Sequence, residues 1–127
     1  KSIRGTFAHI LSAQDVWRHR MAEGVNPTSL RDFAEYAALA DLRGAYAKME
    51  SLWHPYLASL TEAQLSAPVA WKNTRGVEAT APLWQVLTHI VNHSTQHNSE
   101  IAQMLTDLGH SPGNIDMIYW VIQQNKA

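Results

Sequence analysis

The feature that most constrains the fold is a helical pattern over residues 83–108. Apolar side chains recur there every three or four residues, the spacing of one face of an α-helix. Thr80 suits the N-cap, Pro82 suits the first turn and Gly109 suits the C-terminal end. A helix of this length has to bury its apolar stripe against other helices, so the sequence predicts an all-α protein. The stripe comprises Leu83, Val86, Leu87, Ile90, Ile101, Met104, Leu105 and Leu108.

Two further segments carry clear helical patterns. Residues 6–22 place apolar side chains at helical spacing, and Gly24 followed by Pro27 predicts the end of that helix. A short final helix is expected over residues 117–124, with Asp116 as its N-cap. Its apolar side chains are expected to pack against the other helices.

The middle of the chain predicts one more long helix. Thr28 or Ser29 can cap it, and its apolar stripe continues to Leu60. Pro55 lacks a backbone N–H and clashes with the preceding turn, which predicts a kink or a break near residues 52–54.

A short irregular region follows before the long helix of residues 83–108. Thr61 and Gln64 have the spacing of a capping box, and Pro68 ends helical character. Residues 69–80 then place apolar side chains on both sides of the turn-forming residues 73–76. This pattern predicts a small hairpin or irregular excursion.

Composition narrows the classes of function. Ten Lys and Arg residues against eleven Asp and Glu residues give a formal net charge of −1, which offers no basic surface for nucleic acid. No run approaches the roughly 20 apolar residues of a membrane span, and no secretory leader opens the chain. A single cytoplasmic domain over residues 1–127 is therefore expected. Because the chain has no cysteine, imidazole and carboxylate are its available metal ligands.

Two histidines interrupt the apolar stripe of the long helix. The stripe predicts apolar residues at positions 93, 94 and 97, and His93 and His97 occupy two of them. Side chains four residues apart lie on one helix face, so the two imidazoles can chelate one metal ion. The alternative is a pair of hydrogen-bonded histidines in the core or in a groove.

A metal site needs a third ligand, and His9 is the best candidate. It lies on the apolar stripe of the first helix, so it can approach from a different helix, as a site in a helical bundle requires. His89 is one turn before His93 but drifts around the helix, which favours a flanking position. Glu100 is seven residues after His93 and lies on the same face. It can orient a ligand or act as a general base, or it is simply an exposed helix carboxylate. The remaining histidines, His19, His54 and His110, are expected to have no functional role.

Three stretches of the sequence carry a family resemblance. They are SIRGTFAHI at residues 2–10, LTHIVNHSTQH at residues 87–97, and residues 108–116 together with Tyr119. With these stretches the chain resembles the DinB-like family of bacterial metal-binding helical bundles. That family includes DNA-damage-inducible proteins and thiol-dependent transferases.

The resemblance implies an up-and-down four-helix bundle with His9, His93 and His97 as the metal ligands. Members of the family carry an additional helix before the first metal motif, and the present sequence does not include one. Residues are therefore expected upstream, or a partner chain covers the exposed face, as in a homodimer.

Three neutral imidazoles leave a divalent ion its charge and an open position, which is the arrangement of a catalytic site. Zinc is the first expectation, with nickel and iron as alternatives. Two reactions on a small-molecule substrate follow: hydrolysis by an activated water, or transfer of a low-molecular-weight thiol bound as a cosubstrate. The thiol reaction is the one that the resemblance implies. A metal-binding stress-response or dimeric scaffold protein without turnover is the alternative.

Overall fold

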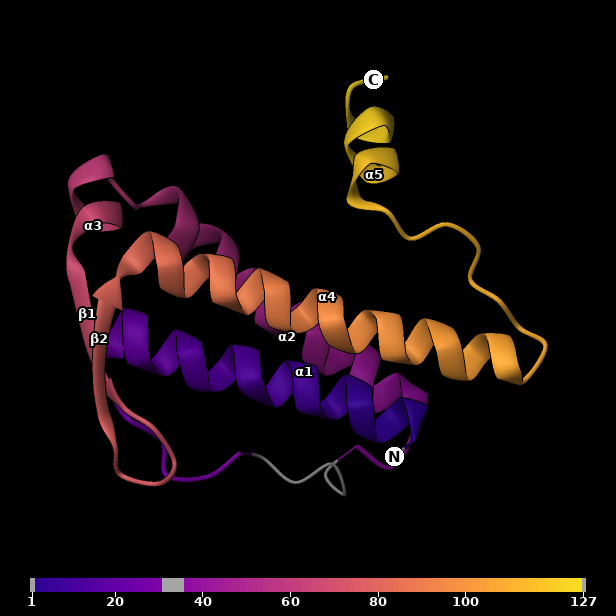
Figure 1. Cartoon of the computed structure of the whole chain (residues 1–127), viewed down its shortest axis with the longest axis horizontal. Helices are drawn as coiled ribbons and strands as arrows, with labels where there is room; N and C mark the ends of the chain where they lie inside the picture. Colours follow the sequence, from indigo (N-terminus) through magenta and orange to yellow (C-terminus); the bar gives the residue numbers. More distant parts are fainter. Residues whose placement is uncertain (1, 31–35, 127) are drawn as a thin grey trace.

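The computed structural model describes residues 2–30 and 36–126 and shows a mostly helical chain with one small sheet (Figure 1). In chain order the elements are α1 (Ile3–Arg18), the π-helical turn η1 (His19–Glu23), α2 (Leu39–Ala58), α3 (Glu62–Ser66), β1 (Pro68–Lys72), β2 (Glu78–Pro82), α4 (Leu83–Asp107) and α5 (Met117–Gln124).

Helix α1 is the centre of the fold, because it packs against both α2 and α4. Its N-terminus is capped by Ser2, whose hydroxyl accepts a hydrogen bond from the backbone N–H of Gly5 at 3.1 Å. The predicted end at Gly24 is confirmed, since this residue has a φ of 66° and terminates η1. The core consists of the buried apolar residues Ala8, Ile10, Leu11, Val16, Tyr36, Leu42, Met49, Leu83, Val86, Ile90 and Ile101.

Helix α2 differs from its prediction at both ends. Neither Thr28 nor Ser29 caps it, because α2 begins at Leu39, where the Asp41 carboxylate accepts a hydrogen bond from the backbone N–H of Ala38 at 2.8 Å. The break predicted near residues 52–54 is also wrong, because α2 continues through Pro55 and ends at Ala58. The alternative, a kink, stays a prediction. Phe33, which the longer prediction included, lies outside the described residues.

The region between α2 and α4 follows the sequence more closely. Thr61 and Gln64 form the predicted capping box, with reciprocal hydrogen bonds to each other's backbone N–H. Strands β1 and β2 form the predicted hairpin, antiparallel and in a register that pairs Trp71 with Ala79. Asn73 stabilises the turn, because its side-chain oxygen accepts hydrogen bonds from two backbone N–H groups of the loop.

Helix α4 follows directly on the hairpin. Thr80 does not cap it, because Thr80 belongs to β2 and pairs with Ala70. The first N–H of the helix is satisfied by the residue that precedes β1, because Leu83 donates to the carbonyl of Ala67 at 2.9 Å. Gly109 ends the helix as predicted, with a φ of 78°. Neither α4 nor another helix of the described ranges combines the length and apolar character needed to cross a bilayer.

Helix α5 has the predicted bounds but not the predicted packing. Figure 1 shows it standing apart from α4 at the end of an extended connection. None of its residues is buried. The expectation that its apolar side chains pack against the other helices is therefore wrong for this structure.

Candidate metal centre

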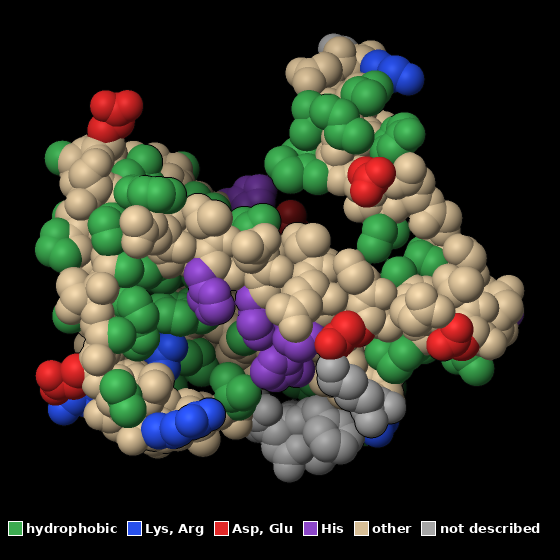
Figure 2. All heavy atoms as spheres, in the orientation of Figure 1, with side chains coloured by type: hydrophobic (Ala, Val, Ile, Leu, Met, Phe, Trp, Pro, Cys, Tyr) green, Lys and Arg blue, Asp and Glu red, His purple; other side chains and the backbone are tan. Residues whose placement is uncertain are grey.

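The packing of α1 on α4 brings the predicted histidines together. His9 comes from α1, and His93 and His97 come from successive turns of α4. Beside them, the side-chain amide of Gln14 donates a hydrogen bond to the Ser94 hydroxyl at 3.2 Å and joins the two helices. Figure 2 shows histidine side chains gathered on one face of the molecule, where they reach the surface.

The three imidazoles converge on a common space. Each offers one ring nitrogen, and these three nitrogens lie within 4.8 Å of one another. The ring centroids of His9 lie 5.1 Å from His93 and 4.7 Å from His97, and those of His93 and His97 are 4.5 Å apart. The rings are tilted or edge-on to one another, so they do not stack face to face.

This donor set fits a divalent transition metal. Imidazole nitrogen is a preferred ligand of zinc and binds it at about 2.0–2.1 Å, so two nitrogens on one ion lie at most about 4.2 Å apart. The three rings are half-buried, and the 4.8 Å limit on the separation of their nitrogens is close to this value. Three protein ligands also leave a coordination position for another molecule.

The environment keeps His93 ready to bind a cation. Desolvation by burial, followed by the proximity of His97 and His9, lowers the pKa of His93 to about 4. The ring is therefore neutral at pH 7, and a neutral imidazole retains the lone pair that a metal requires.

Glu100 fixes the orientation of one candidate ligand. Its carboxylate oxygen lies 2.8 Å from Nδ1 of His97. A carboxylate can only accept, so Nδ1 carries the proton and Nε2 keeps the free lone pair. The side chains of His97 and Glu100 are 13% and 31% exposed, so the contact is well shielded. Of the two roles predicted for Glu100, this contact matches the orientation of a ligand.

Beside the cluster lies an aromatic wall that includes His89, which was expected in a flanking position, and two tryptophans whose place there was not predicted. The centroid of the Trp17 ring lies 5.2 Å from that of Trp71, in the hairpin, and 5.4 Å from that of His89. The ring centroids of His89 and His93 are 5.9 Å apart. The guanidinium of Arg20 lies over the ring of Trp17, 4.6 Å from the ring centroid. The four-residue spacing of His89 and His93 could have indicated this position, because His89 precedes His93 by one turn and shares much of its helix face.

The remaining histidines lie away from this cluster. His19 is half-buried, and its Nδ1 donates to the carbonyl oxygen of Asp15 at 2.7 Å. His54 is 75% exposed and lies 3.5 Å from the carboxylate of Glu50. His110 is exposed after the end of α4. None of the three belongs to the group of His9, His93 and His97.

Comparison with known proteins gives one result. A family model described as "DinB family" matches residues 1–126, essentially the whole chain, which confirms the resemblance found in the sequence. Neither a curated protein nor a solved structure matches the chain significantly.

Proposed function

The chain belongs to the DinB family, and from this membership and its histidine cluster we propose that it is a metal-dependent enzyme. In this proposal His9, His93 and His97 bind one divalent transition-metal ion, zinc in the first place. The observation that carries the proposal is the convergence of three imidazole nitrogens, from two helices distant in sequence, within 4.8 Å of one another. The long helices would then form part of a DinB-like four-helix bundle.

The residues around the cluster have separate tasks in this proposal. His93 is held neutral by burial, which lowers its pKa. The hydrogen bond from Nδ1 of His97 to Glu100 fixes the ring orientation of His97 and leaves its Nε2 as the nitrogen with a free lone pair. When bound, the ion supplies a positive charge that lowers the pKa of a water or thiol placed against it.

We propose that the reaction is the transfer of a low-molecular-weight thiol to an electrophile or the hydrolysis of a small molecule. The chain has no cysteine, so the thiol has to enter as a cosubstrate. Three imidazole ligands add no negative charge to the ion, which favours the binding of an anionic thiolate or hydroxide. The aromatic rings of Trp17 and His89 would form an aromatic wall next to that position.

A second candidate function is metal binding without turnover. The contact that favours it is the one between Glu100 and His97, because a carboxylate engaged in orienting a ligand is not available as a general base in that position. Proton transfer would then rest on the substrate or on solvent.

Metal content tests the site itself. The protein is purified without a nickel column, its metals are measured by elemental analysis, and the metal-free form is titrated with zinc. We expect one ion per chain, and loss of that ion in His97→Ala. His54→Ala is the matched control, because it removes another imidazole, one that is 75% exposed and lies outside the cluster. Unchanged metal content in His97→Ala and His93→Ala would contradict the proposed site.

Turnover separates the two candidate functions. The zinc-loaded protein and its metal-free form are compared on electrophiles with and without low-molecular-weight thiols, and on activated esters and amides. Metal-dependent consumption of the thiol supports the transferase, and metal-dependent hydrolysis without thiol supports the hydrolase. Full metal occupancy without either reaction favours the binding protein.

A further inference from the structure

The aromatic wall beside the histidine cluster is partly open to solvent. Trp17 and Trp71 are half-buried, and His89 is exposed. Figure 2 shows hydrophobic side chains on the same face as the histidines, between them and the hairpin. Aromatic ring surface next to a candidate metal ligand is therefore within reach of a small molecule.

A buried cation holds the two tryptophans of the wall in place. Arg20 is 8% exposed, its guanidinium lies over the ring of Trp17, and no ion pair of the described residues includes it. It also donates a hydrogen bond to the carbonyl of Lys72 at 3.0 Å, next to Trp71 in β1. The side-chain oxygen of Asn26 accepts a hydrogen bond from the N–H of Lys72 at 2.8 Å. The rings are thus positioned before a ligand arrives, which lowers the cost of binding one.

The rings of the wall meet edge to face. The interplanar angle is 71° between Trp17 and Trp71, and it is also 71° between Trp17 and His89. Aromatic groups favour edge-to-face or offset-stacked contacts, and such contacts stabilise a pair of rings beyond the area that they bury. A flat, conjugated ring of a ligand can make these contacts with the open part of the wall, whereas a puckered aliphatic ring gains only from buried area.

The wall adjoins one of the candidate metal ligands. His89 is one turn before His93 on α4, and their ring centroids are 5.9 Å apart. A ring that rests on the wall therefore lies beside the histidine cluster, and a reactive bond attached to that ring can be held close to a thiol cosubstrate.

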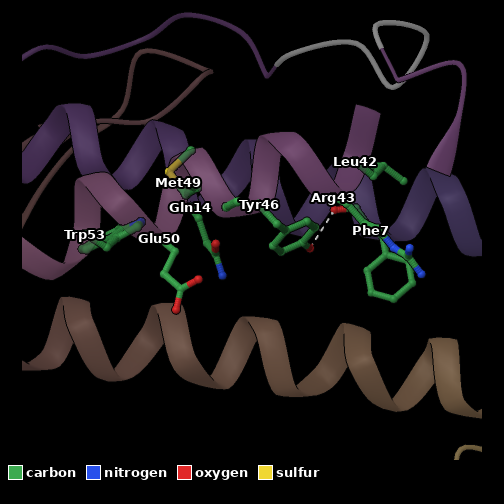
Figure 3. A pocket seen from close by; sticks show the side chains of 9 residues that line it. Phe7, Gln14, Leu42, Arg43, Tyr46, Met49, Glu50 and Trp53 are labelled. Carbon is green, nitrogen blue, oxygen red and sulfur yellow. Dashed lines mark hydrogen bonds between the residues drawn. The ribbon is translucent and has the colours of Figure 1, made fainter. Parts of the chain in front are cut away.

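A second aromatic surface does not include the cluster. The cavity along α2 measures about 520 Å³, and Figure 3 shows Phe7, Tyr46 and Trp53 among the side chains that line it. Its described lining contains neither a clustered histidine nor a ring of the wall. This cavity is the competing site for a flat molecule, and the experiment has to separate it from the wall.

We propose that the aromatic wall binds a planar, conjugated ring of the electrophile, so that the substrates of this protein carry their reactive bond on or in such a ring. This inference rests on the proposed thiol transfer. With a conjugated alkene as the electrophile, the thiol gives its proton to solvent and its sulfur forms a bond to one alkene carbon. The π-electron pair moves toward the neighbouring carbon and its carbonyl, and that carbon then takes a proton from solvent. The addition needs no oxidant or further co-reactant.

Two unreactive probes test the wall without turnover. N-phenylsuccinimide and N-cyclohexylsuccinimide carry rings of similar size and lack the alkene, but only the phenyl ring is planar and conjugated. An NMR titration of the zinc-loaded and the metal-free protein follows the indole N–H signals. We expect N-phenylsuccinimide to bind about three- to tenfold more tightly and to shift the signals of Trp17 and Trp71 but not that of Trp53. Equal affinities, or a shift of Trp53 instead, would overturn the inference.

Variants of one ring locate the preference. Trp17→Leu should lose most of the preference for the phenyl probe, and Trp17→Phe should keep most of it because its ring is planar. Trp84→Leu is the matched control, because Trp84 is 51% exposed on α4 and makes no ring contact with the wall within the described residues. A helical circular dichroism signal equal to that of the wild type shows that each variant is folded. A preference that Trp17→Leu leaves unchanged contradicts the inference.

Turnover tests the same preference during the reaction. The kcat/KM for N-phenylmaleimide and for N-cyclohexylmaleimide, each divided by the uncatalysed rate with the same thiol, should differ in the same direction as the probe affinities. Trp17→Leu should remove this difference. Absence of zinc binding or turnover with the ring preference of the probes intact contradicts the proposed function and supports the ring site. Turnover without a ring preference contradicts the inference and leaves the proposed function in place.

Discussion

The α1–α4 interface and helix α5 show opposite relations between polarity and packing. Where α1 meets α4, polar side chains such as His9, Gln14 and Ser94 lie within a packed helix interface. In α5, which stands apart from α4 (Figure 1), apolar side chains such as Trp120 lie exposed. Polar groups in a packed interface are costly unless they bind something, and apolar groups in water are costly unless something covers them. The α1–α4 interface therefore favours a small ligand, and the surface of α5 favours contact with protein.

The largest expected effect contrasts the core with α5. Leu11→Ala should lower the free energy of unfolding by about 2–5 kcal/mol, because Leu11 is 2% exposed and its removal leaves a cavity. Ile118→Ala should change it by no more than about 0.5 kcal/mol when the chain is monomeric, because Ile118 is 57% exposed. Urea denaturation at low protein concentration measures both. A large decrease in the free energy of unfolding of Ile118→Ala under these conditions would show that α5 packs on its own chain. The core and α5 would then not differ in packing.

The contrast also explains which elements the sequence could predict. Signals that act within a few residues were sufficient: Gly24 and Gly109 end helices with positive φ, and Thr61 with Gln64 builds the capping box. The histidines of α4 were found because they replace apolar residues on a stripe whose neighbours Ile90 and Ile101 are buried.

The errors come from contacts that no local pattern encodes. Thr80 has the properties of an N-cap, but its pairing with Ala70 in the hairpin takes precedence. The apolar pattern of α5 correctly predicts a helix but not its partner, because periodicity indicates that a face must be covered and not what covers it. The aromatic contact between Trp17 and Trp71 depends in the same way on how the hairpin folds against α1.

Glu100 provides the next test, on the polar side of α1. Glu100→Ala should weaken zinc binding by about 10–100-fold, because the ring of His97 loses the carboxylate that orients it. Glu100→Gln should weaken zinc binding less than Glu100→Ala does, since an amide oxygen still accepts a hydrogen bond from Nδ1 of His97. Competition with a chromophoric chelator measures both affinities, with Glu50→Gln as the exposed control. An unchanged affinity in Glu100→Ala would show that packing alone orients His97.

A smaller effect should appear in the pH dependence of the metal-free protein. The pKa of His93 is about 4 in the folded chain and 6.5 in the reference state. Between these values the unfolded chain binds more protons than the folded one, so the free energy of unfolding rises with pH from about 4 to 6.5 and is level above. The ring is partly exposed, so the gain should be about 1–2 kcal/mol, less than the full shift implies. Urea titrations with chelator present measure the slope, which His93→Gln should remove and His54→Ala should preserve.

The smallest effect concerns α3, which contributes none of the three clustered histidines. Thr61→Ala should lower the free energy of unfolding by about 1 kcal/mol, because it removes one half of the capping box of α3. Zinc affinity should stay unchanged, since α1 does not contribute to this cap. Thermal denaturation and zinc titration on the same preparation check both quantities. A loss of zinc affinity in this variant would mean that α3 and the hairpin help to position α4. The polar side of α1 would then depend on the whole chain and not on the α1–α4 interface alone.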